Sequence, residues 1–268
     1  MKKLLFILIY IICLNLNSVN LKKIIDVNNG WSLFFISKNN IIITEKTGSI
    51  KLFNIKNKSI KSIKHNLNIS SSGQGALMDI VSYGGVIWVS YSEDMPNGST
   101  TSVASGMIKN NSITFKNIFR ALPVINSNYH YGGRLVLKNG SIFVTVGDRG
   151  KGMIAQDYEK HPGSIIKIGI DGGLVLDNPS FENNIGWLPE IYQIGVRNPQ
   201  GLEYSFNDKN IYITNHGAKG GDWFGVVKKG ENYGWKILGW GGKNYIGTKI
   251  GPKWTPSFTK PIHYWVPS

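Results

Sequence analysis

The apolar residues of this chain fall in short runs that are separated by polar turns. No segment of helical length keeps an apolar period of 3.6 residues, so the pattern predicts strands and not helices. The strongest predicted strands are Ile41–Thr44, Val86–Ser90, Ile142–Val146 and Ile211–Thr214. Further strands are expected over Trp31–Ile36, Ser49–Ile55, Val103–Lys109, Ser112–Phe119, Ser164–Ile170, Glu190–Gly195, Gly201–Phe206 and Trp223–Lys228.

The strongest strands recur at intervals of roughly 45 to 70 residues, a spacing close to that of β-propeller blades with loop insertions. Three to four such units are visible in the 268 residues. The last segment, Trp254–Ser268, is rich in aromatic residues and proline and supplies no strand that would close a ring. We therefore expect an all-β fold, an incomplete propeller, and a chain that is a fragment of a longer protein.

One stretch, Tyr129–Gly150, predicts a β-hairpin. Its apolar runs Leu135–Leu137 and Ile142–Val146 flank an Asn-Gly pair, a strong hairpin signal because both residues tolerate positive φ. The outer ends of a hairpin return to the same edge of the sheet, so His130 and Asp148 are expected to face each other there. A histidine whose tautomer is fixed by a carboxylate is suited to act as a general base.

The N-terminus differs in character from the rest of the chain. Lys2 and Lys3 precede a short apolar run that ends at Leu16, which predicts a secretory signal peptide over residues 1–20. The run is too short to favour a spanning helix, and an uncleaved surface anchor is the alternative. Residues 21–268 are then expected to be one periplasmic or secreted domain with no stable membrane span. The single cysteine, Cys13, falls within the signal, so the mature domain has no disulfide.

The net charge of +14 raises the question of a nucleic-acid partner. The basic residues are spread along the chain and no recognition motif accompanies them, so we expect no nucleic-acid binding. A Gly-x-Gly-x-x-Gly pattern between a strand and a helix is also absent from the sequence, which gives no support for a nicotinamide cofactor.

Glycine-rich stretches with polar side chains lie where loops meet strands, so all of them could line one face of a propeller. They are Ser72–Met78, His130–Leu135 leading into Gly147–Gly150, Gly195–Gly201, and Asn215–Asp222 leading to Gly230–Trp235. Taken in order with Ala155–Ile168 and Glu190–Gly201, they resemble the soluble quinoprotein glucose/sorbosone dehydrogenases, or aldose sugar dehydrogenases. The resemblance runs from about residue 30 to the end, and RNPQG, HGxxGGD and NYGW in this order are specific.

The resemblance implies a six-bladed propeller, here lacking its last blade or blades. It also implies a site for pyrroloquinoline quinone (PQQ) and calcium on the top face. The implied reaction is oxidation of an aldose sugar at C1 to the lactone, with hydride passing to the quinone. The electrons would then leave to a quinone or cytochrome acceptor that the sequence does not identify, as it does not identify the sugar.

The resemblance also implies roles for individual residues. His130 takes the proton of the anomeric hydroxyl, Asp148 orients His130, and Arg197 stabilises charge on the quinone oxygen. Gln74 and Asn198 bind the cofactor by hydrogen bonds, together with Arg197. The main-chain carbonyls of Gly217 and Ala218 bind calcium, which prefers hard oxygen ligands.

Three positions depart from the family pattern. Ala218 replaces a proline, Trp223 replaces an acidic residue, and Tyr129 stands where glucose dehydrogenases of the family carry an acid. The basic residues that hold the cofactor carboxylates in the family come from later blades.

Structural interpretations stand beside the functional ones. Asp148 and Arg149 could form only a turn cap with a surface ion pair, and Arg197 could only brace its loop. Asp222 could be a calcium ligand or a turn residue. The remaining histidines are expected to be satisfied surface residues, and Tyr233 and Trp235 to pack between blades. The histidines concerned are His65, His161, His216 and His263.

Two other functions are compatible with the sequence. A propeller lactonase or similar calcium hydrolase would need side-chain carboxylates that converge on the metal, and this chain has few acids for that purpose. A non-catalytic propeller binding module is the third hypothesis, because the fold alone does not fix function.

Overall fold

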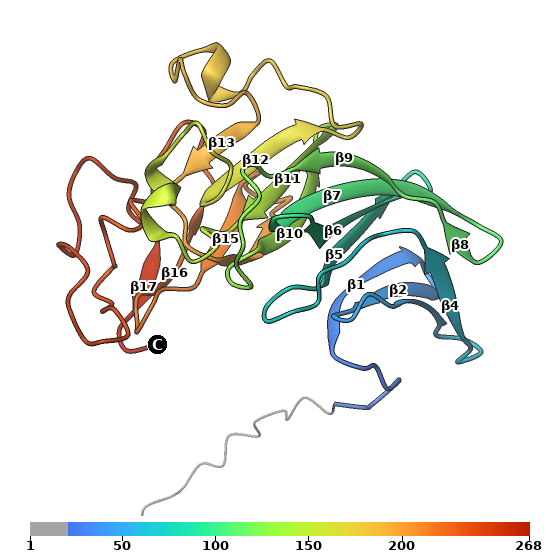
Figure 1. Cartoon of the computed structure of the whole chain (residues 1–268). Coiled ribbons are helices and arrows are strands. Elements are labelled where there is room, and N and C mark those ends of the chain that lie inside the picture. Colours follow the sequence, from blue (N-terminus) through green and yellow to red (C-terminus); the bar gives the residue numbers. More distant parts are fainter. Residues whose placement is uncertain (1–20) are drawn as a thin grey trace, which may run out of the picture.

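The computed structural model describes residues 21–268, which form an almost entirely β structure (Figure 1). The helical segments in this part of the chain are two short 3-10 turns, η1 (Gly152–Gln156) and η2 (Pro179–Phe181). The expected all-β class is therefore confirmed. The predicted signal peptide, with Cys13, lies outside the described residues. Within residues 21–268, no helix has the length and apolar character needed to cross a bilayer.

The strands build four antiparallel blades in chain order, from blue to red in Figure 1. The first blade contains β1 (Gly30–Ser37), β2 (Asn40–Glu45), β3 (Ile50–Asn54) and β4 (Ile60–His65). The second contains β5 (Leu77–Tyr83), β6 (Val86–Met95), β7 (Gly98–Lys109) and β9 (Lys116–Arg120), and the short β8 (Ser112–Ile113) joins it to β4. The third contains β10 (Gly132–Lys138), β11 (Ser141–Val146), β12 (Ser164–Gly169) and β13 (Ile191–Ile194). The fourth contains β14 (Pro199–Tyr204), β15 (Ile211–Asn215), β16 (Asp222–Val226) and β17 (His263–Trp265).

Apolar clusters fill the space between consecutive blades. Strand β11 has the sequence Ser-Ile-Phe-Val-Thr-Val, and every one of these positions is buried. Ile142 and Val144 pack in the cluster shared with the second blade, which includes Trp88. Phe143 points to the opposite face and packs in the cluster shared with the fourth blade. A strand covered on both faces gains from apolar side chains at every position.

The predicted hairpin is confirmed as β10 and β11. Lys138 pairs with Ser141, which leaves Asn139 and Gly140 as a two-residue turn with φ values of 50° and 74°. Positive φ at both central residues is the type I′ geometry, which matches the right-handed twist of the flanking strands. The Asn-Gly turn therefore determines the register of the two strands.

Several features of the structure differ from the sequence expectations. The strand predicted over Ser112–Phe119 is divided into β8 and β9, because the side chain of Asn66 replaces a strand partner at Phe115. Asn66 Oδ1 accepts from Phe115 N (2.8 Å) and Asn66 Nδ2 donates to Phe115 O (3.1 Å). Strand β4 was not predicted, because its sequence Ile-Lys-Ser-Ile-Lys-His is mostly exposed and carries lysines. The short β17 was not predicted either.

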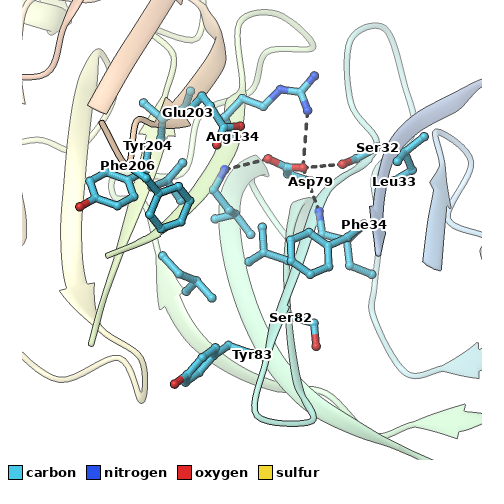
Figure 2. Close-up of a pocket in the computed structure, with 16 residues that line it drawn as sticks. Ser32, Leu33, Phe34, Asp79, Ser82, Tyr83, Arg134, Glu203, Tyr204 and Phe206 are labelled. Carbon is cyan, nitrogen blue, oxygen red and sulfur yellow. Dashed lines mark hydrogen bonds and ion pairs between the residues drawn. The ribbon is translucent and has the colours of Figure 1, made fainter. Parts of the chain in front are cut away.

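The first strands of neighbouring blades, β1, β5, β10 and β14, lie next to one another. A cavity of about 480 Å³ lies among them (Figure 2). Within it, Asp79 of β5 accepts hydrogen bonds from Ser32 Oγ (2.5 Å) and Leu135 N (2.9 Å), and Arg134 Nη1 lies 3.5 Å away. This network ties three blades together, and none of the predicted site residues lines the cavity.

Candidate functional site

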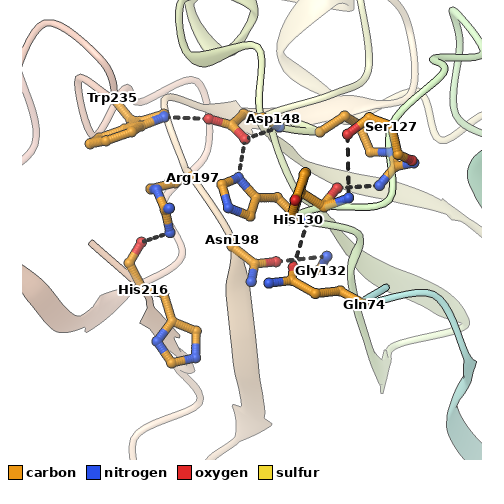
Figure 3. A network of polar contacts seen from close by, with 12 residues as sticks. Gln74, Ser127, His130, Gly132, Asp148, Arg197, Asn198, His216 and Trp235 are labelled. Atoms are coloured by element: carbon orange, nitrogen blue, oxygen red, sulfur yellow. Dashed lines mark hydrogen bonds and ion pairs between the residues drawn. The ribbon is translucent and has the colours of Figure 1, made fainter. Parts of the chain in front are cut away.

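The predicted pairing of His130 and Asp148 is present in the structure. His130 precedes β10 and Asp148 follows β11, and the imidazole Nδ1 lies 2.6 Å from Asp148 Oδ1 (Figure 3). The carboxyl group is 1% exposed and the imidazole 12%. A hydrogen bond from Nδ1–H to the carboxylate leaves Nε2 unprotonated, with its lone pair available to accept a proton. Asp148 thus fixes the orientation of the imidazole.

Every oxygen of the Asp148 carboxylate has a donor. Oδ1 also accepts from Gly150 N (2.8 Å), and Oδ2 accepts from the indole Nε1 of Trp235 (2.6 Å). The main-chain N of Asp148 donates to Arg197 O (2.7 Å). The carboxylate is thus buried with its hydrogen-bonding capacity used, as a buried charged group requires.

The backbone of His130 is held in the left-handed region, with φ at 51°. This conformation is uncommon for a residue with a Cβ and persists where the surroundings over-determine it. Here His130 N donates to Gln74 Oε1 (2.7 Å), and the main-chain O of His130 accepts from Arg149 N (3.3 Å). A Cβ on Gly147 would lie 2.1 Å from His130 O, so only glycine allows this close approach.

Arg149 supports the loop that carries His130. Arg149 is 2% exposed, so the interpretation as a surface ion pair is wrong. The guanidinium donates to the main-chain oxygens of Tyr129 and Ser127 and to Ser99 Oγ (2.9 Å). It also lies 3.4 Å from the ring centroid of Tyr131. Burial lowers the pKa of Arg149, and the carbonyl contacts offset part of the cost of burying its charge.

The loop before β14 carries Arg197 and Asn198. Both main-chain N atoms donate to Asn215 Oδ1, at 2.9 and 3.0 Å. The Arg197 guanidinium lies against the Trp235 ring, 5.5 Å from its centroid, and Nη2 donates to Tyr245 OH (3.1 Å). Arg197 therefore braces the loop through its main chain while its side chain lines the cavity described below.

The amide side chains of Gln74 and Asn198 are each held by a hydrogen bond to the amide oxygen. Gln74 Oε1 accepts from His130 N (2.7 Å), and Asn198 Oδ1 accepts from Gly132 N (3.1 Å). A main-chain N–H requires an oxygen at that position, so the amide orientation is determined. Within residues 21–268, neither NH₂ group has a protein acceptor. Each is available to donate to a bound ligand.

The predicted calcium loop is stabilised by Asp222. Its Oδ1 accepts from Gly217 N (2.7 Å), and Oδ2 lies 3.4 Å from His216 Nδ1. Asp222 therefore makes the contacts of a turn residue, which is one of the two roles that the sequence left open for it. Gly217 and Ala218 both line the cavity. Trp223, at the position where the family has an acid, is buried against Tyr233 with ring centroids 4.1 Å apart.

All the predicted site residues converge on two adjoining cavities. The larger, of about 260 Å³, is lined by Gln74, His130, Arg197, Asn198, Gly217 and Ala218 among others. The smaller, of about 170 Å³, contains Asp148 and Trp235 and shares four residues with the first: His130, Arg197, Ala218 and Tyr245. The predictions from sequence thus identified one contiguous polar site.

The donor chemistry of this site fits a quinone with calcium. A guanidinium and two amide NH₂ groups can donate to the oxygens of an anionic quinone, and main-chain carbonyls suit calcium. Within the described part of the chain, no three His, Cys, Asp or Glu side chains gather as metal ligands. The carboxylate cluster that a calcium hydrolase would need is therefore not found among these residues.

Sequence reasoning missed two residues of the site, and it misplaced one histidine elsewhere in the molecule. Trp235, expected only to pack between blades, donates its indole N–H to Asp148, 87 residues away. Tyr245 was not considered, although its hydroxyl contacts Arg197. His161 is not a surface residue: it is 5% exposed, and its Nδ1 accepts from Leu122 N (2.9 Å). The NYGW motif was the only available signal for Trp235.

Comparison with known proteins places these residues in context. The family described as "Glucose / Sorbosone dehydrogenase" matches residues 27–268. The aldose sugar dehydrogenase YliI of Escherichia coli is 30% identical over 97% of this chain and 75% of its own length. Quinoprotein glucose dehydrogenase B of Acinetobacter calcoaceticus is 27% identical over 80% of this chain. This chain spans about half of that relative, 52%. The solved apo form of soluble aldose sugar dehydrogenase from Escherichia coli superimposes with a TM-score of 0.83 and 30% identity, over 89% of this chain and 72% of that one.

Proposed function

The chain belongs to the glucose/sorbosone dehydrogenase family, and we propose that it oxidises an aldose sugar at C1 to the lactone with PQQ as cofactor. Its relatives are named as aldose sugar and quinoprotein glucose dehydrogenases, which supports an oxidoreductase acting on sugars. The observation that carries the finer proposal is the buried His130–Asp148 pair beside amide and guanidinium donors.

Gln74, Arg197 and Asn198 would hold the quinone, and the carbonyls of Gly217 and Ala218 would hold calcium. Bound PQQ would supply a hydride acceptor for the sugar C1, and bound calcium would supply a Lewis acid that polarises the quinone. The NH₂ groups of Gln74 and Asn198, which have no acceptor within residues 21–268, would provide directional donors, because their oxygens are already bound to main-chain N–H groups. Arg197 supplies a positive charge where negative charge develops.

His130 acts as the general base in this proposal. Its Nε2 takes the proton of the C1 hydroxyl while Nδ1–H remains hydrogen bonded to Asp148. The carboxylate holds the imidazole in the required tautomer and stabilises the imidazolium that forms. The imidazole is 12% exposed and lines the cavity, which supports this role.

The cellular setting is also a proposal. The basic and apolar character of residues 1–20 supports secretion or export to the periplasm. A soluble or membrane-associated quinone or cytochrome would then accept the electrons. We propose no nucleic-acid partner.

The decisive experiment uses the protein expressed from its complete reading frame and reconstituted with PQQ and calcium. Reduction of a redox dye is measured with a panel of aldoses for the wild type and for His130→Gln. We expect aldose-dependent dye reduction that His130→Gln abolishes. No activity of the wild type, or full activity of His130→Gln, would contradict the proposal.

A further inference from the structure

Trp235 occupies a position that the proposed reaction does not yet explain. This residue is 6% exposed, and its indole Nε1–H donates to Asp148 Oδ2 at 2.6 Å (Figure 3). The other carboxylate oxygen, Oδ1, receives the His130 Nδ1–H, also at 2.6 Å. Asp148 therefore lies between the indole and the imidazole, with one oxygen directed to each.

Trp235 is itself held by a different part of the molecule. Its main-chain N donates to Gly195 O (3.0 Å), and its main-chain O accepts from the side-chain amide of Gln156. Gln156 Oε1 in turn accepts from Asn232 Nδ2 (2.8 Å). The main chain of Trp235 is thus anchored to Gly195, in the loop before β14, and to η1, and not to the loop residues that carry His130.

This anchoring has a consequence for Asp148. The χ2 torsion of an aspartate has a broad energy profile, so donors on one oxygen alone leave the carboxylate plane poorly defined. A donor on the second oxygen, fixed by a separate element, removes this freedom. The direction of the His130 imidazole then follows from the carboxylate plane, and a general base requires such alignment.

We propose that Trp235 is a positioning residue that sets the carboxylate plane of Asp148 and, through it, the orientation of His130. The centroid of the same ring lies 5.5 Å from the Arg197 Cζ, so Trp235 lies beside both Asp148 and Arg197. This inference rests on the proposed function in assigning His130 as the base. The coupling itself can be measured without any cofactor.

The first test is spectroscopic and uses the protein with ¹⁵N-labelled histidine. The Nδ1–H proton of His130, bound to a buried carboxylate, is expected as a resolved downfield resonance that is absent in His130→Gln. Trp235→Phe is expected to shift this resonance and to speed its exchange with solvent.

The matched control is Trp88→Phe. Trp88 is 2% exposed and donates its indole N–H to Ile170 O (2.8 Å), remote from His130. This variant also removes a buried indole donor, so it is expected to lose stability but to leave the His130 resonance unchanged. An unchanged resonance in Trp235→Phe, or an equal shift in Trp88→Phe, would overturn the inference.

A second variant separates the N–H from the ring. Replacing Trp235 by β-(3-benzothienyl)alanine keeps the ring area and exchanges the N–H for sulfur. It is expected to reproduce the spectral change of Trp235→Phe, and a wild-type resonance here would also overturn the inference. This variant guards against misfolding caused by the smaller phenylalanine.

The kinetic test uses the reconstituted enzyme. Loss of the N–H is expected to lower kcat roughly 10-fold with little change in KM, because alignment of the base and not sugar binding is affected. Unchanged kcat would overturn the positioning role. If the wild type shows no sugar oxidation, the proposed function fails, and the resonance of His130 alone decides whether Trp235 positions it.

Discussion

At the scale of single residues, the site depends on the exact match between donors and the two oxygens of Asp148. Oδ1 faces His130 Nδ1–H and Gly150 N–H, and Oδ2 faces the Trp235 indole N–H. A residue with one oxygen cannot serve all three donors. The identity of this residue as a carboxylate is therefore a requirement of the local geometry.

Asp148→Asn should accordingly lower kcat by roughly 10²-fold or more, since its NH₂ group must face one of these donors and favours the wrong imidazole tautomer. Steady-state kinetics of the reconstituted enzyme measure the effect. Asp79→Asn is the control, because Asp79 is also buried and accepts from main-chain N–H groups, in the remote cavity. It should lose stability and keep kcat. Equal losses of kcat in both variants would contradict the role of Asp148.

Arg149→Lys tests the brace beneath His130. An ammonium cannot reproduce a planar fork that contacts the carbonyls of Ser127 and Tyr129 together. We expect the free energy of unfolding to fall by about 1–3 kcal/mol, measured by denaturant titration, with a lower kcat because the His130 loop loosens. In the control Arg120→Lys, at a partly exposed pair with Glu93, kcat should be retained. Wild-type kcat in Arg149→Lys would show that the loop does not need this brace.

At the scale of elements, the hairpin of β10 and β11 carries the base at one end and the Asn-Gly turn at the other. Gly140 has a φ of 74°, and nothing lies within 4 Å of a Cβ added there. Gly140→Ala should therefore cost about 1 kcal/mol of stability through backbone conformation alone. Thermal or denaturant unfolding measures this cost.

The position next to it provides the comparison. Asn139→Gly should leave stability nearly unchanged, because glycine adopts the φ of 50° found there without strain. Neither variant should change kcat, since the turn lies at the end of the hairpin opposite His130. A loss of activity in either would mean that the turn and the site are coupled.

The elements that sequence predicted share one property: their signal is local. The Asn-Gly pair and its flanking apolar runs determine the hairpin, and the ends of a hairpin must meet, so the His130–Asp148 contact could be predicted. Strand β4 was not predicted because it is mostly exposed and its lysines interrupt the apolar pattern. The role of Trp235 was not predicted because its partner, Asp148, lies on a distant segment, and that of Arg149 was not predicted because no periodicity reports contacts between a side chain and main-chain oxygens. The other assignments of site residues came from resemblance to a family and not from pattern.

At the scale of the whole molecule, blades are joined by polar ties as well as apolar clusters. His161, between β11 and β12, exchanges main-chain and ring hydrogen bonds with Leu122, which follows β9. Because Nδ1 accepts from Leu122 N, the ring proton is on Nε2, which lies 3.4 Å from Glu190 Oε2. The hydrogen bond from His161 lowers the pKa of Glu190.

This shift predicts a pH dependence of stability. A lowered pKa in the folded state stabilises the protein above the ordinary glutamate value, and the contribution is lost as pH falls through the folded value. Glu190→Gln should therefore be less stable than the wild type near pH 7, by about 1 kcal/mol since the carboxylate is partly exposed. The difference should vanish under acid, well below pH 4.5. Denaturant titrations of both proteins across pH 3–7 measure it, and a constant difference would exclude Glu190 as its source.

The hydrogen bond between Trp235 and Asp148 has a further consequence for how the chain folds. It joins residues 87 positions apart, on segments attached to the third and fourth blades. Closing so long a loop carries an entropic cost that must be met before the contact can form. Each blade can pair its own strands earlier, from local contacts. The orientation of the histidine is then a late event in folding, and its protection from solvent exchange would report when the two blades have docked.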